Sequence, residues 1–119
     1  MKRKPLIIAL LSVVIIVSMA YAEYYFTHSV DNGETKATES VLMESERQYY
    51  VYVHGVGTEG VLELRVKDSQ GNTVFFAPSV YFENVALFTV PSTGYYTCIT
   101  KNITTGENQR LHADWWDTN

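Results

Sequence analysis

Hydrophobic side chains occupy every second position through most of the chain after Glu23. The clearest example is Val61–Asp68, in which apolar and charged residues alternate: Leu62, Leu64 and Val66 against Glu63, Arg65 and Lys67. A period of two places these sets on opposite faces of a β-strand, as a half-buried antiparallel sheet requires. No stretch after Glu23 has the period of an amphipathic helix. The alternation therefore predicts an all-β fold.

Turn residues divide this part of the chain into short strands. The turn Asp68-Ser69-Gln70-Gly71-Asn72 makes residues 61–77 the best-defined hairpin, because Gly71 can take a positive φ. Pro78 should end the second strand of that hairpin or mark a bulge. The expected strands are residues 35–43, 48–54, 61–68, 73–77, 84–90, 95–101 and 109–115, and residues 24–30 form a first strand or a stalk. About seven or eight such strands predict a small antiparallel β-sandwich of jelly-roll or immunoglobulin-like type.

The same alternation predicts the core. Side chains on the apolar faces of the best-defined strands should be buried: Leu62, Leu64, Val66, Phe88, Tyr96 and Cys98. Cys98 is the only cysteine, and its alternating position favours a core thiol over an intermolecular disulfide or a nucleophile. Because no paired cysteine or Cys/His pattern occurs, the sequence predicts no metal site, haem or other cofactor.

An uncharged apolar run, residues 6–20, follows the basic start Lys2-Arg3-Lys4. Residues 1–22 therefore form a signal peptide or an N-terminal transmembrane helix. The motif Ala20-Tyr21-Ala22 favours cleavage after Ala22, whereas the length of the run and the aromatic residues after it favour retention. In both cases the positive charges precede the run, so residues 23–119 should form one extracytoplasmic domain.

The charge of residues 23–119 restricts the partners. This part has six basic and thirteen acidic residues, a net charge of −7. Such a surface repels phosphate backbones and therefore disfavours nucleic acid as a partner.

Residues 41–102 resemble two families of exported sandwich domains. The pre-peptidase C-terminal domain has similar elements, which here are residues 48–55, Gly60, the turn at residues 68–71 and the motif at residues 88–96, Phe-Thr-Val-Pro-Ser-Thr-Gly-Tyr-Tyr. The GOLD domain ends in a similar way, with Gly94, Tyr96, Cys98 and Asn102 at the matching positions, but its disulfide partner is missing here. These resemblances imply a β-sandwich with a non-catalytic binding or accessory role.

The immunoglobulin fold supplies a further local resemblance. Gly94-Tyr95-Tyr96-Thr97-Cys98 is similar to the tyrosine-corner strand, in which the tyrosine lies two residues before a cysteine. The earlier cysteine and the core tryptophan of that family are absent.

Residues with catalytic or metal-binding chemistry are scattered. His112, Asp114 and Asp117 could approach one cation, but Trp115-Trp116 intervene and solvated side chains are the expectation. No serine lies in a nucleophile-elbow context, and no pair of carboxylates stands out. The sequence therefore predicts that the protein is not an enzyme.

Aromatic residues are the strongest candidates for binding. Adjacent strand residues point to opposite faces, so one ring of each neighbouring pair should lie outside or at an interface. The candidate partner-binding residues are Trp115, Trp116, Tyr50 and Tyr95. Protein contact is favoured over glycan stacking, because no polar cluster accompanies the rings in the sequence.

Asn102-Ile103-Thr104 is a glycosylation sequon, expected in a surface loop of an exported protein.

Together these features predict a membrane-tethered accessory or structural subunit of a cell-surface or membrane complex, with other membrane or surface proteins as its partners. A secreted module that binds a ligand or a glycan is the alternative. A surface filament subunit that adds strands edge to edge is a third possibility.

Overall fold

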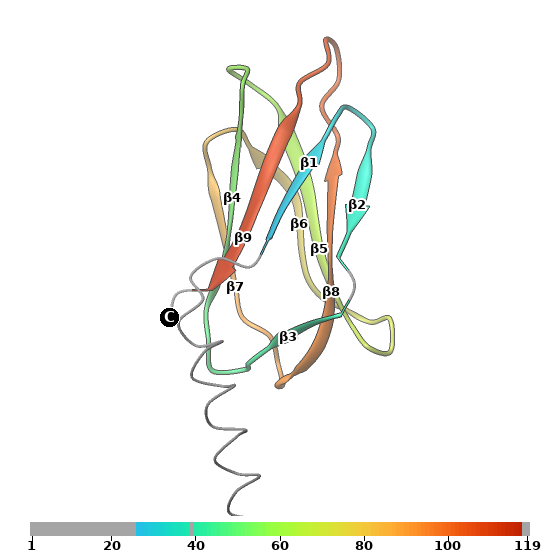
Figure 1. Cartoon of the computed structure of the whole chain (residues 1–119), viewed down its shortest axis with the longest axis vertical. Coiled ribbons are helices and arrows are strands. Elements are labelled where there is room, and N and C mark those ends of the chain that lie inside the picture. Colours follow the sequence, from blue (N-terminus) through green and yellow to red (C-terminus); the bar gives the residue numbers. More distant parts are fainter. Residues whose placement is uncertain (1–25, 39, 118–119) are drawn as a thin grey trace, which may run out of the picture.

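The computed structural model describes residues 26–38 and 40–117, which form strands and turns (Figure 1). The strands are β1 Phe26–Val30, β2 Thr35–Ala37, β3 Val41–Met43, β4 Tyr49–Gly55, β5 Val61–Asp68, β6 Thr73–Tyr81, β7 Val85–Phe88, β8 Gly94–Asn102 and β9 Leu111–Asp117. The all-β prediction is confirmed for this part of the chain. None of its residues belongs to a helix that could cross a membrane. The N-terminal helix or signal segment predicted at residues 1–22 lies outside the described residues.

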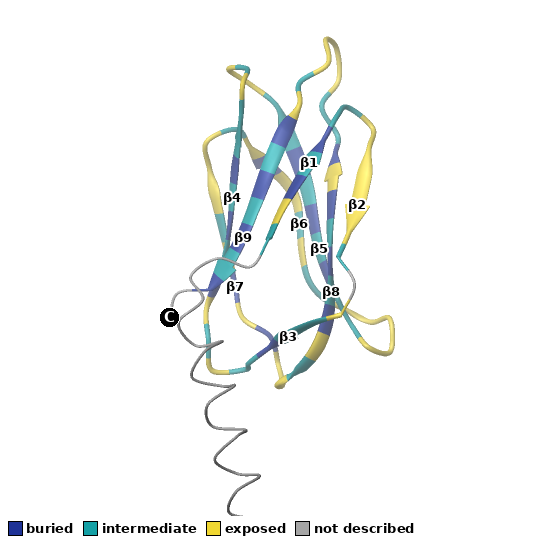
Figure 2. Ribbon diagram, in the orientation of Figure 1, coloured by how far each residue is buried: buried dark blue, intermediate teal, exposed yellow. Residues whose placement is uncertain are grey.

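Two antiparallel sheets face each other (Figure 1). The first sheet has the strand order β1-β9-β4-β7. The second has the order β2-β8-β5-β6, and β3 also pairs with β8. Along β4, β5 and β9 the residues alternate between buried and partly exposed, so each sheet has one face in the core (Figure 2). This confirms the predicted sandwich.

The segment expected as one strand at residues 35–43 is divided into β2 and β3. Both pair with β8, through Ala37 opposite Ile99 and Val41 opposite Tyr96. Between these two pairs the chain from β2 to β3 advances by four residues, whereas β8 advances by three. The extra residue interrupts the ladder, which is a local irregularity that alternation in the sequence does not reveal.

Pro78 lies within β6 and does not end it. Val80 pairs with Leu62 and Ala77 with Leu64, so β6 carries an extra residue at Pro78 and Ser79. Of the two outcomes predicted for Pro78, the end of a strand or a bulge, the structure has the bulge. A proline fits here because β6 is an edge strand of its sheet and does not need every N–H for pairing.

The predicted core residues are all buried between the sheets: Leu62, Leu64, Val66, Phe88, Tyr96 and Cys98. Burial raises the pKa of the Cys98 thiol to about 12, so the thiol stays protonated and unreactive at neutral pH. The Tyr96 hydroxyl donates to the Ser92 carbonyl four residues earlier. This is the hydrogen bond that a tyrosine corner makes to the preceding backbone.

His28 is buried in β1 and hydrogen-bonds two hydroxyl groups. Its Nδ1 lies 2.7 Å from Thr100 Oγ1 and its Nε2 lies 2.8 Å from Thr38 Oγ1. Burial and, secondarily, the charge of Lys36 lower the pKa of His28 from 6.5 to about 4. The ring is therefore neutral in the folded domain at neutral pH.

The low pKa of His28 predicts acid sensitivity. Below pH 6.5 the unfolded chain binds a proton at this ring, whereas the folded domain excludes it down to about pH 4. The free energy of unfolding therefore has no loss from His28 above pH 6.5. It falls as the pH drops toward 4, by about 3 kcal/mol in total from this ring. Urea unfolding across this range measures the loss. His28→Gln should flatten the profile, and an unchanged profile in this variant would contradict the assignment.

Candidate binding surface on the outer face of the first sheet

Three adjacent aromatic pairs on β4, β8 and β9 are each divided between the core and the surface. Tyr49 and Trp115 are buried, whereas their neighbours Tyr50 and Trp116 lie partly exposed on the outer face of the first sheet. Tyr96 is buried and Tyr95 is 59% exposed. The predicted division of these rings is confirmed.

Trp115 is a core residue and cannot touch a partner, so its assignment to a partner surface is wrong. Its side chain is 1% exposed and its Nε1 donates to Thr100 Oγ1 at 3.1 Å. It stacks on Phe26, with 5.6 Å between ring centroids. The cause is its position in β9, where alternate residues from Leu111 onward turn inward.

Tyr50 and Trp116 are cross-strand neighbours in β4 and β9. Their ring centroids lie 5.9 Å apart with planes at 88°, the edge-to-face arrangement that aromatic pairs prefer. On the other side of β4, Leu87 pairs with Tyr50 and Val85 pairs with Tyr52. Both β7 side chains are open to solvent, Leu87 at 51% and Val85 at 49%.

Polar side chains continue the same surface toward the other end of the strands. The His54 Nε2 lies 2.8 Å from Asp114 Oδ2, and Thr27 Oγ1 donates to Asp114 Oδ1 at 2.7 Å. The His112 Nδ1 lies 2.7 Å from Ser29 Oγ. The two imidazole rings are cross-strand neighbours 5.1 Å apart. A polar cluster therefore accompanies the rings, contrary to the expectation from the sequence, because its members come from three separate strands.

We call this surface the aromatic face. Its members are the outward side chains of β4, β7 and β9: Tyr50, Tyr52, His54, Val85, Leu87, His112, Asp114 and Trp116. Thr27 and Ser29 of β1 border it. Among these described residues there is no lysine or arginine, and the single carboxylate, Asp114, is held by Thr27 and His54. By contrast, the outer face of the second sheet carries Glu63, Arg65, Lys67 and Lys101.

Tyr95 does not belong to the aromatic face. It lies on β8, opposite Leu42, and therefore on the outer side of the second sheet. Of the predicted partner-binding residues, the structure brings Tyr50 and Trp116 together and places Tyr95 on the other side of the sandwich. The sequence missed Tyr52, Val85 and Leu87 as members, although their alternation with buried residues was the available signal.

The histidine cluster lacks the connections of a catalytic triad. Ser29 bonds His112 whereas Asp114 bonds His54, so no single imidazole links the hydroxyl to the carboxylate. Asp117 turns inward and accepts from Arg47 Nη1 at 2.8 Å, so it does not join His112 and Asp114. In residues 26–38 and 40–117, no group of three His, Cys, Asp or Glu side chains could hold one metal ion.

Asn102 is the last residue of β8 and is fully buried, so its expected place in a surface loop is wrong. Its Nδ2 donates to the carbonyls of Val30 and Gln109, at 2.9 and 2.7 Å. Its Oδ1 accepts from the Thr104 N–H at 3.0 Å. A glycan would replace one of the amide hydrogens that these bonds use. The folded domain therefore cannot carry a glycan at Asn102.

No protein-family model and no curated protein matches the sequence. Among solved structures, the fold is similar to PliG, a periplasmic inhibitor of g-type lysozyme from Aeromonas hydrophila. The TM-score is 0.54 and the identity 11%, over 83% of this chain and 90% of that chain. At this identity the likeness concerns the arrangement of strands alone.

Two further structures align with lower TM-scores. A de novo designed double-stranded β-helix has a TM-score of 0.49 and 10% identity, over 78% of this chain and 96% of that chain. A family 6 carbohydrate-binding module from Clostridium cellulolyticum has a TM-score of 0.46 and 17% identity, over 76% and 75%. The resemblance to pre-peptidase C-terminal and GOLD domains stays a prediction from the sequence.

Proposed function

We propose that residues 23–119 are a non-catalytic extracytoplasmic domain that binds another protein through the aromatic face. The N-terminal run at residues 6–20 tethers the domain to the membrane, and its partner is another subunit of a membrane or cell-surface complex. The basic residues before that run and the acidic chain after it support this orientation.

The observation that carries the proposal is the composition of the aromatic face. Centres of protein interfaces are depleted of charge and enriched in Tyr and Trp, and a few such residues supply most of the binding energy. Here Tyr50 pairs with Trp116 on one side and with the exposed Leu87 on the other, and the described residues of this face include no basic side chain. Since the chain after residue 22 has a net charge of −7, an outer face nearly without charge is a local exception.

The polar cluster fits the rim of such an interface. His54, His112 and Asp114 keep hydrogen-bonding atoms at one end of the face, while the apolar residues occupy the other. Polar rims surround apolar centres in typical protein interfaces.

The alternative is a secreted module that binds a glycan on the same face, and the polar groups beside the rings favour it. However, a sugar stacks on an open ring face, and these rings cover one another. Tyr52 and His54 are stacked with 13° between their planes, and the edge of one ring in the Tyr50–Trp116 pair meets the face of the other. This packing covers one face on three of these four rings and so reduces the open ring surface for a sugar, which favours a protein partner.

Site-directed photocrosslinking tests the proposal. A benzophenone amino acid at Leu87 of the full chain in its native membrane should give a discrete crosslinked protein. The same probe at Phe76, which is also exposed but lies on the second sheet opposite Arg65, should give none. Trp116→Ala should weaken association by about 2 kcal/mol or more, the size expected for a hot spot, whereas Tyr95→Ala should not.

Equal crosslinking from Leu87 and Phe76, or unchanged association in Trp116→Ala, would overturn the assignment of the face. Mass spectrometry of the N-terminus in the same material separates tether from secretion. A peptide that contains Met1 supports the tether, whereas a mature protein that begins at Glu23 supports the secreted alternative.

A further inference from the structure

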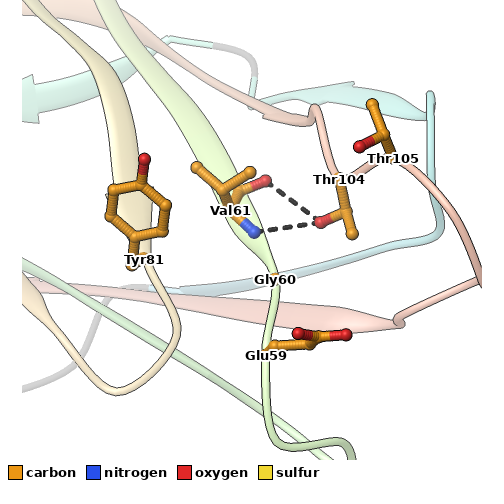
Figure 3. Close-up of a pocket in the computed structure, with 6 residues that line it drawn as sticks. All are labelled: Glu59, Gly60, Val61, Tyr81, Thr104 and Thr105. Atoms are coloured by element: carbon orange, nitrogen blue, oxygen red, sulfur yellow. Dashed lines mark hydrogen bonds between the residues drawn. The ribbon is translucent and has the colours of Figure 1, made fainter.

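A small pocket lies at one end of the second sheet, where β5 begins and β6 ends, and none of its lining residues belongs to the aromatic face (Figure 3). It has a volume of about 210 Å³ and is lined by Glu59, Gly60, Val61, Tyr81, Thr104 and Thr105. Val61 lies between the Tyr81 ring on one side and the two threonines on the other, and Glu59 closes a third side (Figure 3). The Tyr81 ring is 61% exposed.

Hydrogen bonds to the backbone of residues 60 and 61 hold the walls of this pocket in place. The Thr104 hydroxyl accepts from the Val61 N–H at 2.9 Å, and the Ile103 N–H donates to the Val61 carbonyl at 3.1 Å. The Gly60 carbonyl accepts from the Phe82 N–H at 2.9 Å. These bonds connect the start of β5 to the end of β6 and to the loop after β8.

Gly60 is required at its position in this wall. Its φ is +142°, and a Cβ there would lie 2.8 Å from Leu111 Cδ1. The loop therefore packs directly on the core, and this contact holds the Gly60 wall of the pocket in place.

The chemistry of the lining points to one class of ligand. An exposed aromatic ring offers a face to an apolar patch of C–H groups, while the Glu59 carboxylate and the Thr105 hydroxyl can bond the hydroxyl groups of a ligand. The Thr104 hydroxyl is already bonded to the Val61 backbone. The lining includes a carboxylate and no basic residue, so it disfavours anions such as phosphates and acidic sugars. The volume is below the range of about 300–1,000 Å³ typical for drug-sized ligands, so it suits a single small ring.

We propose that this pocket binds one uncharged pyranose ring, the terminal sugar of a neutral glycan. The sugar stacks on Tyr81 and its hydroxyl groups bond Glu59 and Thr105. An organic cation could also approach a tyrosine and a carboxylate, but a quaternary ammonium group has no N–H or O–H with which to bond the Thr105 hydroxyl. The pocket is independent of the aromatic face, so the domain can hold a protein and a glycan at once.

Isothermal titration of the full chain with methyl glycosides of glucose, galactose, mannose and N-acetylglucosamine tests the proposal. The full chain is kept in a polyoxyethylene detergent, which contains no sugar ring that could compete for the pocket. At least one glycoside should bind with a Kd on the order of millimolar, as expected for a ligand with so few atoms. Glucuronate should bind at least about tenfold more weakly than the best neutral sugar, and Glu59→Gln should narrow this difference.

Tyr81→Ala should weaken sugar binding at least about tenfold, because the stacking surface is lost. Tyr95→Ala is the matched control, since Tyr95 has nearly the same exposure on the same sheet but lies at the other end of β8. Thermal unfolding confirms that both variants are folded. No binding by any of these glycosides, saturation by choline instead, or equal losses in the two tyrosine variants would each overturn the proposal. Trp116→Ala should leave sugar binding unchanged. A failure of the sugar-binding proposal can therefore be distinguished from a failure of the proposed protein interface on the aromatic face.

Discussion

Replacing Trp115 with alanine is expected to lower the free energy of unfolding by about 4–5 kcal/mol. The indole is the largest fully buried side chain in the described part of the domain. It packs against Phe26 and Phe88, with ring centroids 5.6 and 5.9 Å away. Its removal leaves a cavity between the sheets and deprives Thr100 of a hydrogen-bond donor. Since small domains are stable by only about 5–15 kcal/mol, urea unfolding should show that this variant is only marginally stable.

Trp116→Ala is the matched control, because it removes the same side chain from the next residue. Trp116 lies on the outer face and leaves no internal cavity, so its loss should cost about 1 kcal/mol or less. The two variants should therefore separate stability from binding, with Trp115 governing the first and Trp116 the second. Similar unfolding energies in both variants would contradict the assigned strand faces.

Asn102→Ala is expected to cost about 3–5 kcal/mol. The change leaves the Val30 and Gln109 carbonyls and the Thr104 N–H without the partners that the Asn102 amide now provides. Each buried polar group that loses its partner costs about 1–3 kcal/mol. Urea unfolding measures the loss, with the exposed Asn84→Ala as the control. A loss no larger than that of Asn84→Ala would show that water replaces the lost bonds.

The connections of Asn102 explain why this prediction is large for one polar residue. Its amide joins the end of β1, the loop after β8 and the residue two positions before β9, segments far apart in sequence. Loops without regular pairing need such bonds, because buried backbone groups must be satisfied. In the sequence, the same asparagine is visible only as part of a glycosylation sequon.

Strand positions and their inward faces could be predicted from the sequence, because alternation is a local property. In Val61–Asp68, Leu62, Leu64 and Val66 face the core and the charged residues between them face outward. Residues 95–101 also alternate, although the polar Thr100 is among the buried residues. The same rule required one of Trp115 and Trp116 to be outside. The residues before the pair indicate which one, because Leu111 and Ala113 share a face with Trp115 whereas His112 and Asp114 share a face with Trp116. The assignment of both indoles to a partner surface overlooked this signal.

Tertiary structure alone decided the composition of the surfaces. The aromatic face joins β4 to β9 and β7, and the pocket joins β5, β6 and the loop after β8, so neither is contiguous in sequence. Residues more than fifty positions apart, such as His54 and Asp114, meet because strand order and register bring them together. Local alternation fixes which way a side chain points, whereas strand pairing fixes its neighbours. For this reason the fold class followed from the sequence, and the binding surfaces required the assembled sheets.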